Sequence, residues 1–166
     1  PHGSANPSCY RRLRLWSLWA RDVIGKRILS IDLDMLLVDD VSSLWNRPED
    51  CVLWADNLNP TTPYNGAMQL ITPGAFPRVI GDFDPNASPA LARRKGFFGS
   101  DQAWLSYILG PDQARWKRED GALSWRLHCK RELPNMPNNA RIINFHGADD
   151  PWTVAPRVNW VAEHYR

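Results

Sequence analysis

Two carboxylates that interrupt an apolar run constrain this chain most. The stretch RILSIDLDMLLVDDVSSLW, residues 27–45, has the composition of a buried strand, but Asp32 and Asp34 break it before apolar residues resume at Met35. In extended chain, residues i and i+2 project from the same face, about 6.6 Å apart along the backbone, so two carboxylates converge on one cation. Hard divalent ions such as Mn²⁺ and Mg²⁺ prefer oxygen ligands. The stretch therefore predicts a metal site at Asp32 and Asp34, at the end of a strand.

Length and charge exclude several other classes of protein. A chain of 166 residues, 43% of them hydrophobic, is long enough for one compact core, so we expect a single domain over residues 1–166. The 20 basic and 18 acidic residues are mixed along the chain, which argues against a nucleic-acid partner. No apolar stretch reaches the roughly 20 residues that span a bilayer and no signal peptide opens the chain, so we expect a cytoplasmic protein without a membrane span. Three widely spaced cysteines are expected to be free thiols.

Expected strands alternate with expected helices, which favours an α/β fold with a largely parallel sheet. We expect strands at residues 26–31, 51–56, 67–72, 123–129 and 140–147. We expect helices at residues 9–21, after the acidic pair at 39–40, after the proline at 73, at 100–109 and from 155 onward. Residues 57–66 and 85–99 are expected to be loops.

A second D-x-D motif, Asp82 with Asp84, shows that the motif alone is weak evidence. A polar segment containing proline follows this second pair, and exposed carboxylates there need no functional explanation. Asp32 and Asp34 differ because apolar sequence flanks them on both sides, where an unpaired buried carboxylate is costly. The end of a strand is also where α/β sheets bind ligands. We therefore assign only the first pair to a metal.

Five segments in one order carry a resemblance to a known family. They read RRLRLWSL, RILSIDLDMLLVDDVSSLW, PYNGAMQLITPG, GSDQAWLSYIL and RIINFHGADDPW. Together they resemble glycosyltransferase family eight and the glycogenin-like enzymes, over about residues 9–152. The resemblance implies the GT-A fold, with a mixed and mostly parallel sheet flanked by helices. It also implies Mn²⁺ or Mg²⁺ as cofactor, and retaining transfer of a sugar from a nucleotide diphosphate sugar, by resemblance a UDP-sugar, to a glycan or other hydroxyl acceptor.

The resemblance also implies roles for single residues on the donor side. Asp32 and Asp34 match the metal-binding D-x-D, with Asp32 also near the donor sugar. Arg12 matches a basic residue that contacts the nucleotide sugar, although from the residues alone it is equally a solvated helix charge. Asn65 and Gly66 match a turn that faces the donor sugar, and N-G is also a common turn signal without any function.

Asp101 and Gln102 match a D-Q pair beside the anomeric carbon of the donor. A carboxylate or carboxamide at that place stabilises an oxocarbenium-like centre, so both residues are candidates for catalysis. Asp101 is also a suitable cap for the helix expected at residues 100–109, and the two roles are compatible.

The third metal ligand is where the resemblance and the residues disagree. The family's strand reads H-F-x-G-x-x-K-P-W, whereas residues 144–152 read NFHGADDPW. Strict alignment puts Asn144 at the histidine, Gly147 at a glycine assigned to the substrate, and Asp150 at a lysine that meets the diphosphate. His146 lies two residues further along the same strand face, and imidazole is the better Mn²⁺ ligand, so we favour His146 over Asn144. Asp150 in place of lysine predicts weak donor binding unless Arg12 or Arg141 compensates.

Two alternatives stay open. The family's nucleotide-binding half normally precedes the helix that contains Arg12, so we expect a chain that lacks the N-terminal part of that half, and such a chain can be a catalytically inert relic that still binds sugar or nucleotide. SIDLDMLLVDD also resembles the haloacid dehalogenase type phosphatases, whose D-x-D-G-T motif uses its first aspartate as the nucleophile. Met35 stands where those phosphatases need glycine, so the transferase is the preferred interpretation.

Overall fold

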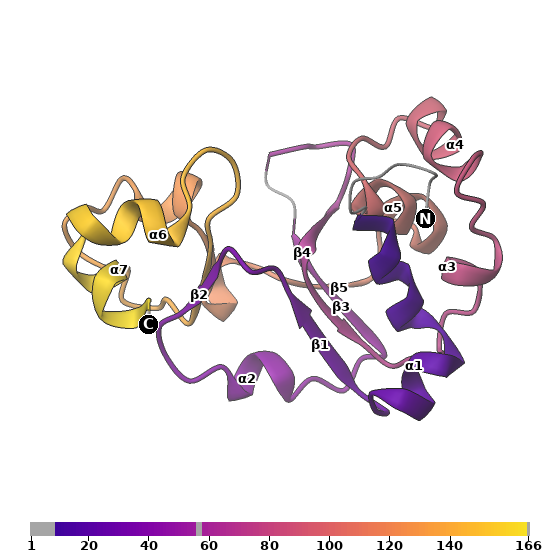
Figure 1. Ribbon diagram of the computed structural model, residues 1–166, viewed down its shortest axis with the longest axis horizontal. Coiled ribbons are helices and arrows are strands. Elements are labelled where there is room, and N and C mark those ends of the chain that lie inside the picture. Colours follow the sequence, from indigo (N-terminus) through magenta and orange to yellow (C-terminus); the bar gives the residue numbers. More distant parts are fainter. Residues whose placement is uncertain (1–8, 56–57, 166) are drawn as a thin grey trace. The chain divides into compact units, whose positions relative to one another are not determined.

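The computed structural model describes residues 9–55 and 58–165, so Asp56, the last residue of an expected strand, lies outside it. The described residues form two compact units (Figure 1). The first unit comprises the described residues of Pro1–Ser30 and Pro48–Arg115, and the second those of Ile31–Arg47 and Trp116–Arg166. The expectation of a single domain over residues 1–166 stays a prediction.

The first unit carries a four-stranded sheet in the order β1-β4-β3-β5 (Figure 1). The strands are β1 (Ile28–Ile31), β3 (Cys51–Ala55), β4 (Tyr64–Ile71) and β5 (Ala114–Trp116). Strands β3 and β4 are antiparallel, and Leu53 pairs with Gln69, whereas the next residue, Trp54, pairs with Asn65. Residues 66–68 therefore form a bulge in β4, a feature that often lies beside functional sites because it redirects side chains.

Helices of the first unit pack with β3 and β4 around one apolar cluster. They are η1 (Cys9–Trp16), α3 (Arg78–Gly81), α4 (Ser88–Arg94) and α5 (Asp101–Leu109), and the unit also contains a further helix, α1 (Leu18–Val23). Trp16, Tyr64 and Trp104 are among the largest side chains of this cluster, and all three are buried. Trp104 Nε1 donates to the Val79 carbonyl at 2.8 Å, and the Tyr64 hydroxyl donates to the Gly110 carbonyl at 2.5 Å. These bonds satisfy the polar ends of buried aromatic rings and connect α5 to α3 and the residue after α5 to β4.

The long N-terminal helix that the sequence predicts is divided at Ser17. The segment before it is a 3₁₀-helix, η1, and Ser17 caps a separate helix, α1. Because the helical phase changes at Ser17, Leu13 and Trp16 are buried, whereas Leu18 and Trp19 are exposed. The prediction of one continuous helix over residues 9–21 is therefore wrong.

Two other boundaries differ from the sequence prediction. The expected loop at residues 85–99 contains α4, whose N-terminal turn includes Pro89. Strand β4 begins at Tyr64, three residues earlier than expected, so Asn65 and Gly66 lie in a bulged strand and not in a turn. The asparagine–glycine pair is therefore used for the bulge, where Asn65 Oδ1 accepts a hydrogen bond from the Ala67 N–H at 2.8 Å.

The second unit carries a three-stranded sheet in the order β2-β7-β6. The strands are β2 (Met35–Leu37), β6 (Ala122–Ser124) and β7 (Ile142–Asn144). The helices are α2 (Ser42–Trp45), η2 (Arg118–Asp120), η3 (Trp125–Cys129), α6 (Pro151–Val154), η4 (Ala155–Arg157) and α7 (Asn159–His164). The core of this unit contains several aromatic rings. Trp125 stacks on Phe145 with ring centroids 4.8 Å apart, and the ring centroids of Trp125 and Trp160 are 5.8 Å apart.

The mixed α/β class is confirmed, and the strands are partly parallel. β6 and β7 run parallel, whereas β2 and β7, like β3 and β4, run antiparallel. The strand expected at residues 123–129 ends at Ser124, because the Ser124 hydroxyl accepts from the Leu127 N–H at 3.2 Å and starts the single helical turn η3. Among the helices of the described ranges, none has the length and apolar composition of a membrane span.

Candidate functional site

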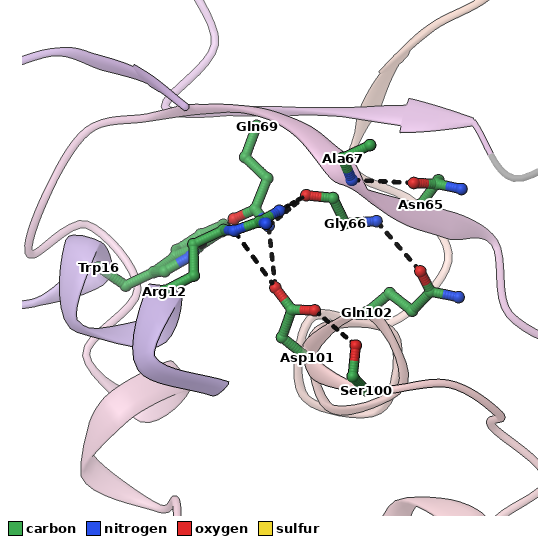
Figure 2. Close-up of polar contacts among 9 residues, drawn as sticks. All are labelled: Arg12, Trp16, Asn65, Gly66, Ala67, Gln69, Ser100, Asp101 and Gln102. Atoms are coloured by element: carbon green, nitrogen blue, oxygen red, sulfur yellow. Dashed lines mark hydrogen bonds and ion pairs between the residues drawn. The ribbon is translucent and has the colours of Figure 1, made fainter. Parts of the chain in front are cut away.

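Five of the residues singled out in the sequence lie around the bulge of β4 (Figure 2). They are Arg12, Asn65, Gly66, Asp101 and Gln102, which come from η1, β4 and α5. The Gly66 carbonyl accepts hydrogen bonds from Arg12 Nη1 and from Gln69 Nε2, the second at 3.0 Å. The Gly66 N–H donates to Gln102 Oε1 at 3.3 Å. One backbone unit of the bulge thus links η1 to the start of α5.

Asp101 is the first residue of α5 and is only 2% exposed. Its carboxylate accepts hydrogen bonds from Ser100 Oγ at 3.0 Å and from Gln69 Nε2 at 3.4 Å, and it forms an ion pair with Arg12 Nε at 3.8 Å. Burial raises the pKa of Asp101, and the positive charge of Arg12 opposes that rise. These contacts hold the carboxylate in one position behind Gly66.

Gln69 is a completely buried polar residue that the sequence analysis missed. Its Oε1 accepts a hydrogen bond from the indole N–H of Trp16 at 3.2 Å, so its Nε2 faces Gly66 and Asp101. A signal for it was present, since Gln69 is the one polar residue within the apolar stretch AMQLI. Buried polar side chains of this kind are hydrogen-bonded and specify a unique arrangement.

Two glycines leave room for the side chains of the cluster. A Cβ on Gly66 would lie 3.0 Å from Asp101 Oδ1, and a Cβ on Gly99 would lie 2.7 Å from Gln102 Nε2. Gly99 also has a φ of +117°, a conformation that favours glycine. Gly66 was predicted from the sequence but Gly99 was not, because its role depends on contacts between residues that the sequence does not display.

Two carboxamide groups present their N–H₂ ends at this cluster. Asn65 Oδ1 accepts from the Ala67 N–H, and Gln102 Oε1 accepts from the Gly66 N–H. Within residues 9–55 and 58–165, the amide nitrogens of Asn65 and Gln102 have no acceptor, and both side chains are half-buried. In Figure 2 both nitrogens point away from Gly66. They are therefore donors available to a ligand rich in oxygen, such as a sugar.

Asp32 and Asp34 belong to the second unit and lie in a turn that precedes β2. The expected extended geometry, with both side chains on one strand face, is therefore wrong, since the intervening Leu33 is 95% exposed at a turn. Both aspartates are half-buried. The Asp34 carbonyl accepts from the Phe145 N–H at 3.0 Å, which brings the turn beside the end of β7.

Asn144 is the last residue of β7, and His146 lies beyond the end of the strand, so the expectation that both lie on one strand face is wrong. Both nevertheless lie beside the same serine. Ser124 pairs with Asn144 in the parallel register of β6 and β7, and Ser124 Oγ is 2.7 Å from His146 Nε2. Asn144 is fully buried, and its side-chain Oδ1 and Nδ2 have no hydrogen-bond partner in the part of the chain that the structure describes. Gly147 follows with a φ of +105°, which ends the strand.

The donor atoms near β7 are of a kind that Mn²⁺ accepts, namely two carboxylates, an imidazole and a carboxamide. Among the described residues, no group of three or more His, Cys, Asp or Glu side chains is placed to hold an ion. The assignment of Asp32, Asp34, His146 and Asn144 to a metal stays a prediction. Asp150 is the N-cap residue before α6, and its N–H donates to Thr153 Oγ1 at 3.0 Å.

The second D-x-D has local structural roles. Asp82 is exposed and pairs with Arg78 at 2.8 Å. Asp84 Oδ1 accepts from the backbone N–H groups of Asn86 and Ala87 at 2.7 and 3.2 Å, which fixes the turn before α4. Both aspartates are explained by these contacts, in agreement with the sequence analysis.

Known proteins resemble this chain in structure but not detectably in sequence. No family model matches it, and no curated protein matches it. The galactosyltransferase LgtC, in complex with donor and acceptor sugar analogues, matches with a TM-score of 0.59 and 14% identity over 86% of this chain and 59% of that one. An active-site mutant of LgtC matches with a TM-score of 0.64 and 13% identity over 94% of this chain and 64% of that one. The glycosyltransferase GlyE of Streptococcus pneumoniae TIGR4 matches with a TM-score of 0.56 and 14% identity, over 90% of this chain and 40% of that one.

These likenesses establish the fold. The structural neighbours are glycosyltransferases of the GT-A type, so the GT-A fold that the sequence predicts is confirmed. The chain spans 40% to 64% of the length of these proteins. Membership of family eight stays a prediction, and the haloacid dehalogenase alternative has no support from the fold.

Proposed function

We propose that this chain is a glycosyltransferase domain that transfers a sugar from a nucleotide diphosphate sugar to a hydroxyl acceptor. The observation that carries the proposal is the cluster of Arg12, Gly66, Asp101 and Gln102, built into a GT-A fold around a bulged strand. A UDP-sugar as donor, retention of the anomeric configuration and dependence on Mn²⁺ are parts of the proposal that rest on the resemblance of motifs.

The cluster supports sugar transfer through two residues with different tasks. Gln102 is half-buried and offers an amide N–H₂ to a ligand, while the Gly66 N–H orients its oxygen. We assign Gln102 to direct contact with the donor sugar, where a fixed dipole stabilises charge that develops as the glycosidic bond breaks. Asp101 is 2% exposed, so we assign it to positioning Arg12.

The ligands of the proposed metal ion come from the second unit. We assign Asp32 and Asp34 as ligands beside Asn144 and His146, because the Asp34 carbonyl accepts a hydrogen bond from the N–H of Phe145, which lies between those two residues. His146 is favoured over Asn144 as the third ligand, since imidazole is the better ligand for Mn²⁺. When bound, Mn²⁺ neutralises the charge of a departing diphosphate. Asp150 stands where a lysine is expected, so donor affinity should be weak.

A thermal-shift experiment tests the function without knowledge of the acceptor. UDP with Mn²⁺ should raise the melting temperature, and UDP with EDTA should not, since a ligand that binds only the folded state stabilises it. Gln102→Ala should retain the shift but slow the hydrolysis of a UDP-sugar. Release of inorganic phosphate from p-nitrophenyl phosphate, without any effect of UDP, would contradict the proposal in favour of a phosphatase.

A catalytically inert domain is the second candidate. The observation that favours it is the absence, among the described residues, of three metal-ligating side chains gathered in one place. Such a domain would give the UDP shift or bind sugar but would hydrolyse no donor. Turnover in the presence of Mn²⁺ therefore separates the two candidates.

A further inference from the structure

A pocket of about 480 Å³ lies on the first unit, outside the cluster around Gly66. Its walls come from η1, α4 and the segment that joins α4 to α5, and they include Tyr10, Arg93, Phe97, Phe98 and Gly99. The volume is in the range of small-molecule sites, which is roughly 300 to 1,000 Å³. The lining combines three aromatic rings with one cation.

The ring of Phe98 is exposed although its backbone is firmly held. Thr62 is completely buried, and its hydroxyl donates to the Phe98 carbonyl at 3.2 Å and accepts from the Phe98 N–H at 2.9 Å. The Phe98 side chain nevertheless remains 48% exposed. A fixed backbone that presents an exposed aromatic ring is a preformed surface, so a ligand that stacks on it orders little of the chain.

The other two rings of the pocket are fixed by packing. Tyr10 stacks on Phe83 with ring centroids 5.2 Å apart and an interplanar angle of 26°. Phe97 lies against Tyr107 with centroids 6.2 Å apart. The pocket therefore has rigid aromatic walls, which suit a flat or ring-shaped ligand with apolar C–H faces.

The edge of the pocket is positively charged. Arg93 lines it, and Arg94 and Lys95 follow at the end of α4. All three are exposed, and none forms an ion pair with another residue of the described ranges. Three neighbouring cations without an acidic partner attract an anion, and an arginine beside a pocket pairs readily with a carboxylate or phosphate.

The pocket adjoins the cluster assigned to sugar transfer. Gly99 lines the pocket, and its Cα is so near Gln102 that a Cβ would lie 2.7 Å from the Gln102 amide nitrogen. Tyr10 also lines it and is close enough to Asp101 for the carboxylate to contribute, after burial, to the raised pKa of Tyr10. A ligand in the pocket would thus lie next to the residues proposed to act on the donor.

We propose that this pocket binds an anionic saccharide, a sugar ring carrying a carboxylate or a phosphate, and that this saccharide is the acceptor. The ring stacks on Phe98, and the anionic group pairs with Arg93. The role as acceptor rests on the proposed function, whereas binding of an anionic sugar to the pocket does not.

Direct titration tests the ligand class. Glucuronic acid, glucose 6-phosphate, glucose and inorganic phosphate are each titrated into the protein and followed by saturation-transfer NMR and calorimetry. We expect at least one of the two anionic sugars to bind about tenfold more tightly than both glucose and inorganic phosphate. The tighter of the two identifies the anionic group as carboxylate or phosphate. Equal binding of glucose, equal binding of phosphate, or no saturable binding of either anionic sugar overturns the proposal.

Paired variants place the binding in this pocket. Phe98→Ala and Arg93→Gln should each weaken the preferred anionic sugar about tenfold. The controls are Trp152→Ala, whose side chain is 49% exposed in the second unit, and Arg21→Gln, an exposed arginine of α1. Unchanged affinity in both pocket variants, or equal loss in the controls, overturns the assignment. A chain that binds the anionic sugar but not UDP with Mn²⁺ would contradict only the proposed transferase, and the reverse result would contradict only the pocket.

Discussion

The indole N–H of Trp16 donates to Oε1 of Gln69 at 3.2 Å, and this contact decides which end of the Gln69 amide faces the candidate site. With its oxygen engaged, Gln69 directs Nε2 to the Gly66 carbonyl at 3.0 Å and to Asp101 Oδ2 at 3.4 Å (Figure 2). The core packing of η1 is thereby coupled to the carboxylate of α5.

Replacement of Gln69 by methionine removes the hydrogen bonds that connect η1 to Asp101, while the volume of the side chain stays similar. Gln69→Met leaves the Trp16 N–H without its buried acceptor and removes one donor from Asp101, so we expect a loss of about 1–3 kcal/mol in the free energy of unfolding. Urea denaturation measures it. In the control, Gln113→Met, only a half-buried contact with the Leu109 carbonyl is lost, so a change within about 0.5 kcal/mol is expected. Similar losses in both variants would contradict the coupling.

A methyl group on Gly66 should disturb the cluster. Gly66→Ala places a Cβ 3.0 Å from Asp101 Oδ1, and the buried carboxylate has little freedom to move, so we expect a loss of about 1–3 kcal/mol. Gly81→Ala is the matched control, since a Cβ there has no heavy atom within 4 Å. Thermal melts measure the change in melting temperature relative to the wild type, and we expect a decrease for Gly66→Ala that Gly81→Ala does not show. Equal melting temperatures of the two variants would show that the contact between the new Cβ and Asp101 is not restrictive.

The pH dependence of stability should carry opposite contributions from two aspartates. Burial raises the folded-state pKa of Asp101, so its contribution is fully present below the ordinary carboxyl pKa and is lost as the pH rises through the raised value. Hydrogen bonds from Lys130 and Trp125 lower the pKa of Asp149, so its contribution is present above the ordinary pKa and is lost as the pH falls through the lowered value.

Urea unfolding over an acidic pH series measures both contributions. Asp101→Asn should remove a contribution to the free energy of unfolding that decreases as the pH rises. Asp149→Asn should remove a contribution that increases as the pH rises. A change of the same sign in both variants would contradict the environments described for the two carboxylates.

The local sequence pattern correctly predicted the helices and strands whose formation depends on residues close together in the sequence. Helix α5, expected at residues 100–109, was found at Asp101–Leu109, and the apolar run before Asp32 formed β1. The pattern failed where a single side chain changes the backbone course. Ser17 divides the first helix, and Ser124 ends a strand by accepting the Leu127 N–H. Period and propensity do not reveal which serine will act as a cap.

The candidate site was predictable in part. Motif resemblance pointed to Arg12 and to the pair Asp101 and Gln102, which the structure brings together around Gly66. Gln69 was missed because its partners are distant in sequence and its polar nature is visible only as an exception within an apolar strand. For Asp32 and Asp34, the apolar flanks suggested extended chain, whereas Leu33 occupies a turn, a choice that depends on the pairing of Asp34 with Phe145.

The three thiols should differ sharply in reactivity. Cys9 is exposed, whereas burial raises the pKa of Cys51 and of Cys129 to about 12. Since the thiolate is the reactive form, Ellman's reagent should label one thiol in the native protein and three after denaturation. Mass spectrometry should locate the native label on Cys9, and rapid labelling of either buried cysteine would contradict the two cores described above.

The central claim is tested most directly by the release of UDP from a panel of UDP-sugars in the presence of Mn²⁺. The wild-type protein should release UDP from at least one donor, and EDTA should stop the reaction. Asp34→Ala should slow release roughly a hundredfold, which corresponds to about 3 kcal/mol of lost stabilisation. Asp82→Ala, which alters the exposed D-x-D paired with Arg78, should retain the wild-type rate. Failure to release UDP from any donor, or equal loss in both variants, would contradict the account.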